Sequence, residues 1–224
     1  MSTENIQFQK KITLSNQDAL IIVDMQNDFM PGGALPVEEG DQIIDNVNKV
    51  AKIFKRNNGL IVLTQDWHPE DHMSFASAHP DKVPGDTFQS EGIGPVLWPD
   101  HCVQGSKGAD FHNKLKVNLA HVIIRKGYNP KVDSYSGFIE NDKKSETGLA
   151  GLLNSLKINR IFICGLALDY CCYFTALDGL EFGFDVYFLV NLTRGIDLPP
   201  GNISKSLQDM TIKGVKFATR DNLL

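Results

Sequence analysis

Cys171 stands where a chain can present a reactive thiol. Residues 165–172 read Gly-Leu-Ala-Leu-Asp-Tyr-Cys-Cys, an apolar run at 161–163 precedes them, and a helical pattern at 173–182 follows. This order predicts a cysteine just past a buried strand, at the mouth of a helix. The positive end of a helix dipole stabilises a thiolate there, which makes Cys171 a candidate nucleophile. The alternative is a cysteine that serves as a small buried hydrophobe.

A nucleophilic thiol needs a base to take its proton or a cation to lower its pKa. Asp24 follows the apolar run at 19–23, and Arg125 and Lys126 follow the run at 122–124. Ligands of doubly wound sheets bind outside the carboxyl ends of the strands, so these side chains would share one edge with Cys171. We therefore expect Asp24 to be the base and Lys126 the cation.

Asp66 and His68 form an Asp-x-His pair directly after the apolar run at 60–63. Residues two apart in an extended chain point the same way, so both side chains can face one ion. Imidazole and carboxylate together suit zinc, iron or manganese. A third ligand would come from His72 or His101, which lie in the long polar stretch between residues 65 and 120. The residues alone do not choose between them.

The elements that would position these residues alternate along the chain. Six continuously apolar runs indicate buried parallel strands, at residues 19–23, 60–63, 122–124, 161–163, 186–190 and 215–217. Four helices are expected between or beside them: one capped by Asp41 and ended by Gly59, one capped by Thr147, one from near Asp169 to Gly183, and one after residues 199–200. A further short helix is expected near 107–115. The pattern predicts one α/β domain over residues 1–224, a three-layer α/β/α doubly wound fold with a six-stranded, mainly parallel sheet.

Composition excludes several function classes. The 224 residues carry a formal net charge of -5 and are 42% hydrophobic, which disfavours a nucleic-acid surface. Apolar runs are of strand length, too short to span a membrane, and the polar residues 1–10 lack a signal-peptide core. We expect a cytoplasmic protein whose four cysteines are reduced and which binds neither nucleic acid nor membrane.

Several motifs appear together in the order of a known family. They are Val-Asp-Met-Gln-Asn-Asp-Phe at 23–29, Thr-Gln-Asp-Trp-His-Pro at 64–69, Trp-Pro-Asp-His-Cys-Val at 98–103, Arg-Lys-Gly at 125–127, Asp-Ser-Tyr-Ser-Gly-Phe at 133–138, and the segment 165–171. With these motifs the chain resembles the nicotinamidase/pyrazinamidase group of the isochorismatase-like cysteine hydrolases, from residue 19 to about residue 196.

The resemblance implies roles for individual residues. It implies a catalytic triad of Asp24, Lys126 and Cys171, and an oxyanion hole formed by the backbone N–H groups of Ala167 and Cys171, with a cis peptide bond before Ala167. The metal ligands it implies are Asp66, His68 and His101, with His72 as an occasional or outer ligand. The aromatic residues it implies around the substrate ring are Phe29, Trp98 and Tyr135.

The activity implied is hydrolysis of nicotinamide, and of pyrazinamide, to the acid and ammonia through a cysteine thioester, in NAD salvage. The cofactor implied is a divalent metal ion, zinc first and iron or manganese otherwise. The resemblance does not decide whether the chain forms a homo-oligomer, because relatives range from monomers to larger assemblies. One alternative is a related hydrolase of another small amide or carbamoyl compound. Another is a non-enzyme, either a redox module using Cys171 and Cys172 or an inactive binding protein. Cys172 departs from the family, which usually has an aliphatic residue after the nucleophile.

Overall fold

The computed structural model describes residues 6–224; residues 1–5, which belong to the expected domain and polar N-terminus, lie outside the described residues. Its sheet has the strand order β3-β2-β1-β4-β5-β6, and every neighbouring pair is parallel. The strands are β1 (Asp18–Val23), β2 (Leu60–Asp66), β3 (Val122–Lys126), β4 (Arg160–Leu166), β5 (Asp185–Arg194) and β6 (Lys216–Ala218). The expected α/β sheet is confirmed, and it is wholly parallel.

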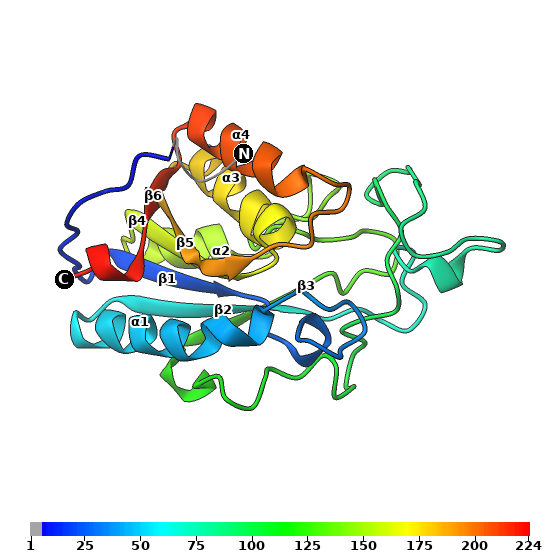
Figure 1. Cartoon of the computed structure of the whole chain (residues 1–224), viewed down its shortest axis with the longest axis horizontal. Coiled ribbons are helices and arrows are strands. Elements are labelled where there is room, and N and C mark those ends of the chain that lie inside the picture. Colours follow the sequence, from blue (N-terminus) through cyan, green and yellow to red (C-terminus); the bar gives the residue numbers. More distant parts are fainter. Residues whose placement is uncertain (1–5) are drawn as a thin grey trace.

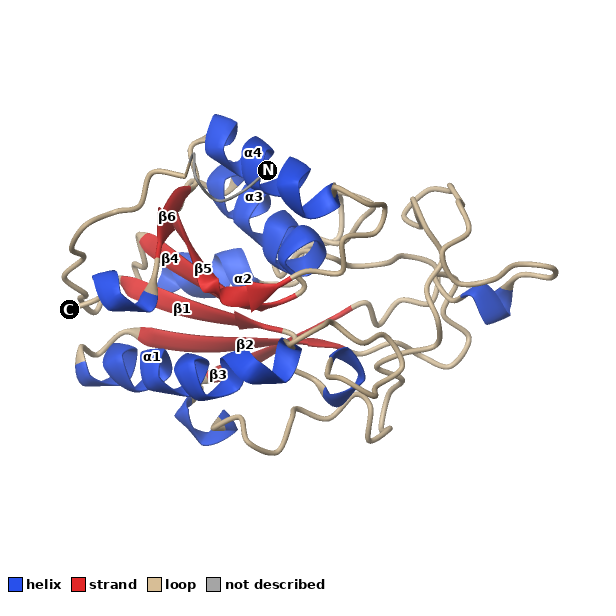
Figure 2. Cartoon of the chain, viewed as in Figure 1, coloured by secondary structure: helices blue, strands red, loops and turns tan. Residues whose placement is uncertain are grey.

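Helices cover both faces of this sheet, as Figures 1 and 2 show. The helix α1 (Ile44–Arg56) packs on one face, and α2 (Leu149–Ser155), α3 (Tyr173–Glu181) and α4 (Asn202–Lys213) pack on the other. The alternation of side chains along β1 divides the core: Leu20 and Ile22 face α1, while Ala19 and Ile21 face the other helices. The three-layer prediction is therefore confirmed.

The helix ends differ in part from the sequence-based expectations. Asp41 does not cap α1, because it lies in a 3-10 turn (Gly40–Ile43) that leads into the helix. The left-handed residue that ends α1 is Asn58, with φ 57°, and not the predicted Gly59, which follows it and donates its N–H to the Phe54 carbonyl oxygen. Thr147 does not cap α2 as predicted, because Gly148 occupies the N-cap position; the Thr147 hydroxyl lies one residue earlier and accepts the N–H of Leu149 at 3.2 Å.

Two other expectations are wrong. Residues 107–115 form turns and no helix, and the nearest helical turn is a 3-10 turn at Val117–Leu119. The strand β3 is not buried on both faces, because it is an edge strand of the sheet and leaves Ile123 44% exposed. No helix among residues 6–224 is long and apolar enough to cross a membrane.

The long connection between β2 and β3 gathers beyond the carboxyl ends of the strands. Figure 1 shows it extending from that end of the sheet, away from the C-terminus. Short parallel bridges hold it together, between His68 and Val103 and between Phe75 and Trp98. A long connection without regular helices in a compact domain is usually functional. Here it brings the predicted histidines and Trp98 to the ends of β1, β2 and β4, while Phe29 follows β1 and Tyr135 follows β3.

Candidate active site

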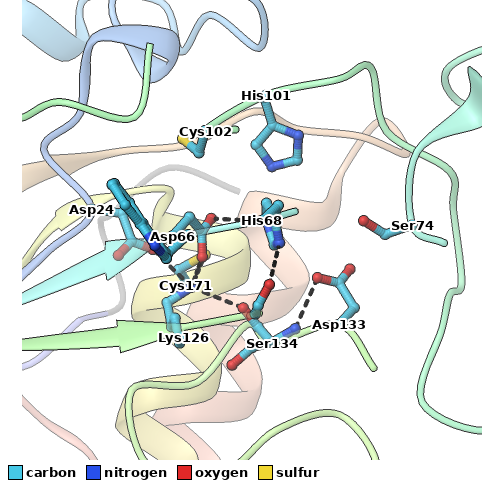
Figure 3. A network of polar contacts seen from close by, with 12 residues as sticks. Asp24, Asp66, His68, Ser74, His101, Cys102, Lys126, Asp133, Ser134 and Cys171 are labelled. Atoms are coloured by element: carbon cyan, nitrogen blue, oxygen red, sulfur yellow. Dashed lines mark hydrogen bonds and ion pairs between the residues drawn. The ribbon is translucent and has the colours of Figure 1, made fainter. Parts of the chain in front are cut away.

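Four residues predicted to act together meet at the carboxyl edge of the sheet. Asp24 follows β1, Asp66 and Lys126 are paired at the ends of β2 and β3, and Cys171 lies in a single π-helical turn (Leu168–Cys172) between β4 and α3. Figure 3 shows their side chains pointing toward one another. All four are nearly or completely buried. Parallel strand order, which places β2, β1 and β4 side by side, explains why residues distant in the sequence converge.

Lys126 is the centre of the polar network. Its Nζ lies 2.5 Å from Asp66 Oδ1, 3.0 Å from Asp24 Oδ2 and 3.5 Å from Cys171 Sγ, and it also donates to the Ser134 carbonyl oxygen at 2.8 Å. Burial disfavours the ammonium ion, but the two carboxylates outweigh burial and hold the Lys126 pKa well above its ordinary value. Lys126 is thus a fixed positive charge beside the thiol.

The two oxygens of the Asp24 carboxyl have different partners: Oδ1 is hydrogen-bonded, and Oδ2 has an ion pair with Lys126. Thr64 donates its hydroxyl to Oδ1 at 2.5 Å, while Oδ2 makes no hydrogen bond to any of residues 6–224 despite its closeness to Lys126. Burial raises the Asp24 pKa to about 6, against the lowering effect of Lys126. A carboxyl that titrates near neutrality and keeps a lone pair free is suited to accept and return a proton.

The Cys171 thiol is neutral in this environment. Burial raises its pKa well above the ordinary value, and Lys126 opposes that effect only in part. Desolvation of the thiolate therefore exceeds the favourable field of Lys126, in line with the expectation that the thiol needs a partner to take its proton. A base must take the proton when the sulfur reacts. The neighbouring Cys172 is fully buried, and only Cys171 of the two lines the adjacent pocket.

Asp66, His68 and His101 form a compact set of metal-ligating groups. One ligand atom from each lies within 4.8 Å of the others, and all three residues are buried. The Nδ1 of His68 lies 2.8 Å from the Gly127 carbonyl oxygen, and the Nδ1 of His101 lies 2.8 Å from that of Pro99. These bonds fix both rings with Nε2 available, as in the outer shell of many metal sites. Burial lowers the His68 pKa well below its ordinary value, which keeps the ring in its neutral, ligating form.

His72 is placed differently. Its Nδ1 accepts the backbone N–H of Ser74 at 3.2 Å and lies 2.7 Å from the Ser74 hydroxyl, and its Nε2 lies 3.3 Å from the Val132 carbonyl oxygen. Both ring nitrogens are therefore engaged by protein groups. His72 can also be grouped with His68 and Asp133, whose Oδ2 makes no hydrogen bond to the described residues. The geometry favours His72 as a neighbour of the three-ligand set.

A small pocket adjoins the thiol and the three metal-ligating residues. Its volume is about 20 Å³, little more than one water molecule occupies. Phe29, Trp98 and Tyr135 line it, as the sequence predicts, and the Trp98 indole N–H donates to the Tyr135 hydroxyl at 3.1 Å. Ala167 also lines it and follows a cis peptide bond. Other lining residues were not predicted: Leu35, Asp133, Ser134, Tyr170 and Ile196.

Arg125 does not join the site. Its guanidinium lies over the Trp67 ring, 3.8 Å from the ring centre, and its Nε donates to Gln65. Successive residues of a strand point to opposite faces, so Lys126 and Arg125 cannot both face the thiol.

Sequence reasoning also missed residues that position the reactive groups. The Gln26 side chain accepts the Asp66 N–H at 2.8 Å and donates to the Asp66 carbonyl oxygen at 2.8 Å, so it holds the backbone of a metal-ligating residue. Asp28 accepts the N–H of Cys102 at 2.7 Å, next to His101. Their place inside the segment 23–29 was the available signal.

Comparisons with known proteins identify the family of this chain and similar solved structures. Residues 18–220 match the family model of the isochorismatase domain. A nicotinamidase of Acinetobacter baylyi is 43% identical over 210 residues, which are 94% of this chain and 96% of that protein. The crystal structure of PnC1 from L. infantum in complex with nicotinate has a TM-score of 0.83 and 39% identity, covering 96% of this chain and 98% of the other. The pyrazinamidase of Pyrococcus horikoshii in complex with zinc has a TM-score of 0.75 and 42% identity, covering 91% of this chain and 99% of the other.

Proposed function

Because the chain belongs to the isochorismatase domain family, we propose that it is a nicotinamidase, which hydrolyses nicotinamide to nicotinate and ammonia. The observation that carries the proposal is the buried contact of Lys126 with Asp24 and Cys171 beside a pocket lined by aromatic rings. Pyrazinamide, which has a similar aromatic ring amide, is proposed as a second substrate. A role in NAD salvage would follow from this reaction, and the cytoplasmic location and a homo-oligomeric state remain predictions.

Asp24, Lys126 and Cys171 are proposed as the catalytic triad. Asp24 takes the thiol proton, the sulfur attacks the amide carbon, and the Lys126 ammonium balances the negative charge that develops near Sγ. Asp24 then gives its proton to the amide nitrogen, the C–N bond breaks, and ammonia leaves a thioester on Cys171. Water, losing a proton to Asp24, attacks the thioester and releases the acid, and the thiol is restored when Asp24 returns the proton.

The backbone N–H groups of Ala167 and Cys171 are proposed as the oxyanion hole. Both residues line the pocket; Ala167 directly precedes the π-helical turn and Cys171 lies within it. Two donors fixed before the reaction stabilise charge that appears only in the transition state, and loss of one such donor typically costs about 2.7–4 kcal/mol.

Phe29, Trp98 and Tyr135 are proposed to hold the substrate ring. These three side chains line the pocket beside the thiol and the metal-ligating residues, where a planar ring would lie between them. Tyr135 is held from two sides, since it accepts from Trp98 and donates to the Gly94 carbonyl oxygen at 3.2 Å.

Asp66, His68 and His101 are proposed to hold a divalent metal ion, with zinc as the first expectation and iron or manganese as alternatives. The donor set of one carboxylate and two neutral imidazoles fits these ions. The ion supplies a Lewis acid that can bind and orient the nitrogen of the substrate ring. Asp66 also contacts Lys126, so this residue joins the metal-ligating group to the triad.

The test is ammonia release from nicotinamide by the purified protein, with and without prior treatment by a chelator. Release that stops in the chelated protein and returns on adding zinc supports both the amidase and the metal. The Cys172→Ala variant serves as the matched control for Cys171→Ala, and only the latter should lose turnover. A protein with bound metal that releases no ammonia would refute the substrate, and other amides and carbamoyl compounds would then be assayed.

A further inference from the structure

Asp169 is a buried acid that the proposed chemistry does not use. It stands two residues after Ala167 and two before Cys171, in the π-helical turn, and it is 1% exposed. A buried carboxylate is costly unless hydrogen-bonded donors surround it. The donors that surround Asp169 all come from one segment, residues 195–202, which joins β5 to α4 and is called the strap below.

The strap is fastened to both oxygens of Asp169. Oδ1 accepts the N–H of Ile196 at 2.9 Å, and Oδ2 accepts the N–H of Asp197 at 2.9 Å. The Asn202 side-chain amide donates to Oδ2 at 3.1 Å and to the Asp169 carbonyl oxygen at 3.2 Å. Figure 1 shows the strap, in orange between β5 and α4, at the carboxyl end of the sheet.

Two more features hold the strap against the nucleophile turn. The Tyr170 hydroxyl donates to the Leu198 carbonyl oxygen at 2.5 Å. Gly195 allows close approach, since a Cβ there would lie 2.8 Å from Asp169 Oδ1 and 2.6 Å from the Ile203 side chain. The strap therefore contacts two of the three residues that precede Cys171.

The strap also forms one wall of the pocket. Ile196, whose N–H Asp169 accepts, lines the pocket together with Tyr170 and Cys171. A second hollow, lined by Asp169, Pro199, Pro200 and Asn202 among others, lies on another side of the same segment. A strap released from Asp169 has room to move there, which would open the pocket beside the thiol.

We propose that Asp169 is a positioning residue that fastens the strap over the pocket, so that one carboxylate sets the distance between the nucleophile turn and the pocket wall at Ile196. The turn itself keeps separate backbone bonds, because Tyr170 and Cys172 both donate to the Ala167 carbonyl oxygen. Loss of Asp169 therefore displaces the wall and leaves the thiol in place. The kinetic part of this inference rests on the proposed function, and the structural part does not.

The test compares Asp169→Asn with the unmodified protein. An asparagine side chain has only one accepting oxygen. Its NH2 group is itself a donor, so it cannot accept a hydrogen bond from the backbone N–H of the strap that it would face. The first readout is the rate at which iodoacetamide alkylates Cys171, followed by peptide mass spectrometry. We expect a rate at least tenfold higher in the variant. The second readout is steady-state kinetics with nicotinamide, where we expect KM to rise at least tenfold and kcat to change less than threefold. This pattern means that the variant binds the substrate and the transition state more weakly by the same factor.

Asp178→Asn is the matched control, because Asp178 is a buried acid on α3 whose ion-pair partner, Lys143, lies outside the strap. It should leave both readouts unchanged. Asn202→Ala removes the two bonds from the Asn202 side-chain amide, keeps those from the Ile196 and Asp197 N–H groups, and should give a smaller effect in the same direction. Unchanged alkylation in a folded Asp169→Asn protein, or equal acceleration in Asp178→Asn, would overturn the proposal. Absence of amidase activity in the unmodified protein would instead count against the proposed function and leave the alkylation result valid.

Discussion

Replacing Asp24 by Asn should abolish turnover and yet stabilise the fold. Burial raises the Asp24 pKa from 3.8 to about 6, so the folded protein prefers the neutral carboxyl. At about 1.36 kcal/mol for each pH unit, this difference corresponds to about 3 kcal/mol. The figure already includes the attraction of Lys126, because that attraction is one cause of the pKa. Asparagine is neutral at every pH and does not carry this cost.

The sign of the pH dependence follows from proton binding. Between pH 3.8 and about 6 the folded state binds more protons at Asp24 than the unfolded state, so this residue makes the protein less stable as pH rises. Well below pH 3.8 the carboxyl is neutral in both states and its cost is absent. Asp24→Asn should therefore lie within about 1 kcal/mol of the unmodified protein near pH 4 and exceed its free energy of unfolding by up to about 3 kcal/mol at pH 8. For a chain of this length that gain is about 6–12 °C in Tm.

The assay is thermal and denaturant unfolding of chelator-treated protein at pH 4, 5, 6 and 8, beside ammonia release at pH 7.5. Loss of a positioned base typically costs about 10²–10⁴-fold in rate. Asp178→Asn is the control, because it removes a buried acid that has a lysine partner at 2.9 Å and should bring no gain in stability. A less stable Asp24→Asn protein at pH 8 would refute the electrostatic reasoning, and activity above a tenth of the original would refute the role as base.

Three further outcomes are expected. Cys171→Ala should release no ammonia while binding one equivalent of zinc, and Cys172→Ala should keep at least a third of the rate; the reverse result would move the nucleophile to the second sulfur. Burial raises the Glu140 pKa from 4.5 to about 7, so its contribution to stability falls as pH rises through that window. Glu140→Gln should therefore gain up to about 3 kcal/mol above pH 7.5 and nothing near pH 4, as followed by denaturant unfolding; an equal gain at both pH values would exclude this cause. Gln26→Leu removes the two bonds to the Asp66 backbone and should weaken zinc binding about 10–100-fold in competition with a chelator, and unchanged affinity would show that the bonds do not position the ligand.

The residues proposed to touch reacting atoms could be predicted from the sequence because each one follows an apolar run. Parallel strands end at a common edge, so Asp24, Asp66, Lys126 and Cys171 needed no tertiary information beyond the strand pattern. Periodicity also separates Lys126 from Arg125, since one residue's shift reverses the face. The order of the strands, and hence which side chains are in contact, depends on packing that the runs themselves do not encode.

The ionisation state of Cys171 and the partners of His72 could not be predicted from the sequence. The position of Cys171 before a helix marks it as a candidate nucleophile, but the pKa of its thiol depends on burial by residues from other parts of the chain. The same holds for His72, which shares a loop with the metal-ligating histidines. Its ring nitrogens are engaged by Ser74 and Val132, and the second of these partners is 60 residues away.

Residues that act on the backbone of others are the hardest to predict from a single chain. Gln26 and Asp66 are 40 residues apart, and Asp169 and Ile196 are 27 residues apart. A polar side chain that accepts N–H groups needs no partner of a particular residue type, so the partner leaves no trace in composition or periodicity. The polar residue itself can be recognised in the sequence, because it lies in a segment whose other residues are expected to be buried. Gln26 and Asp169 each lie two residues from a proposed catalytic residue, Asp24 and Cys171 respectively. In this fold, a buried polar residue near a reactive one therefore indicates a residue that positions the site through hydrogen bonds to backbone groups. The Asp169→Asn alkylation experiment tests this interpretation as well as the role of Asp169.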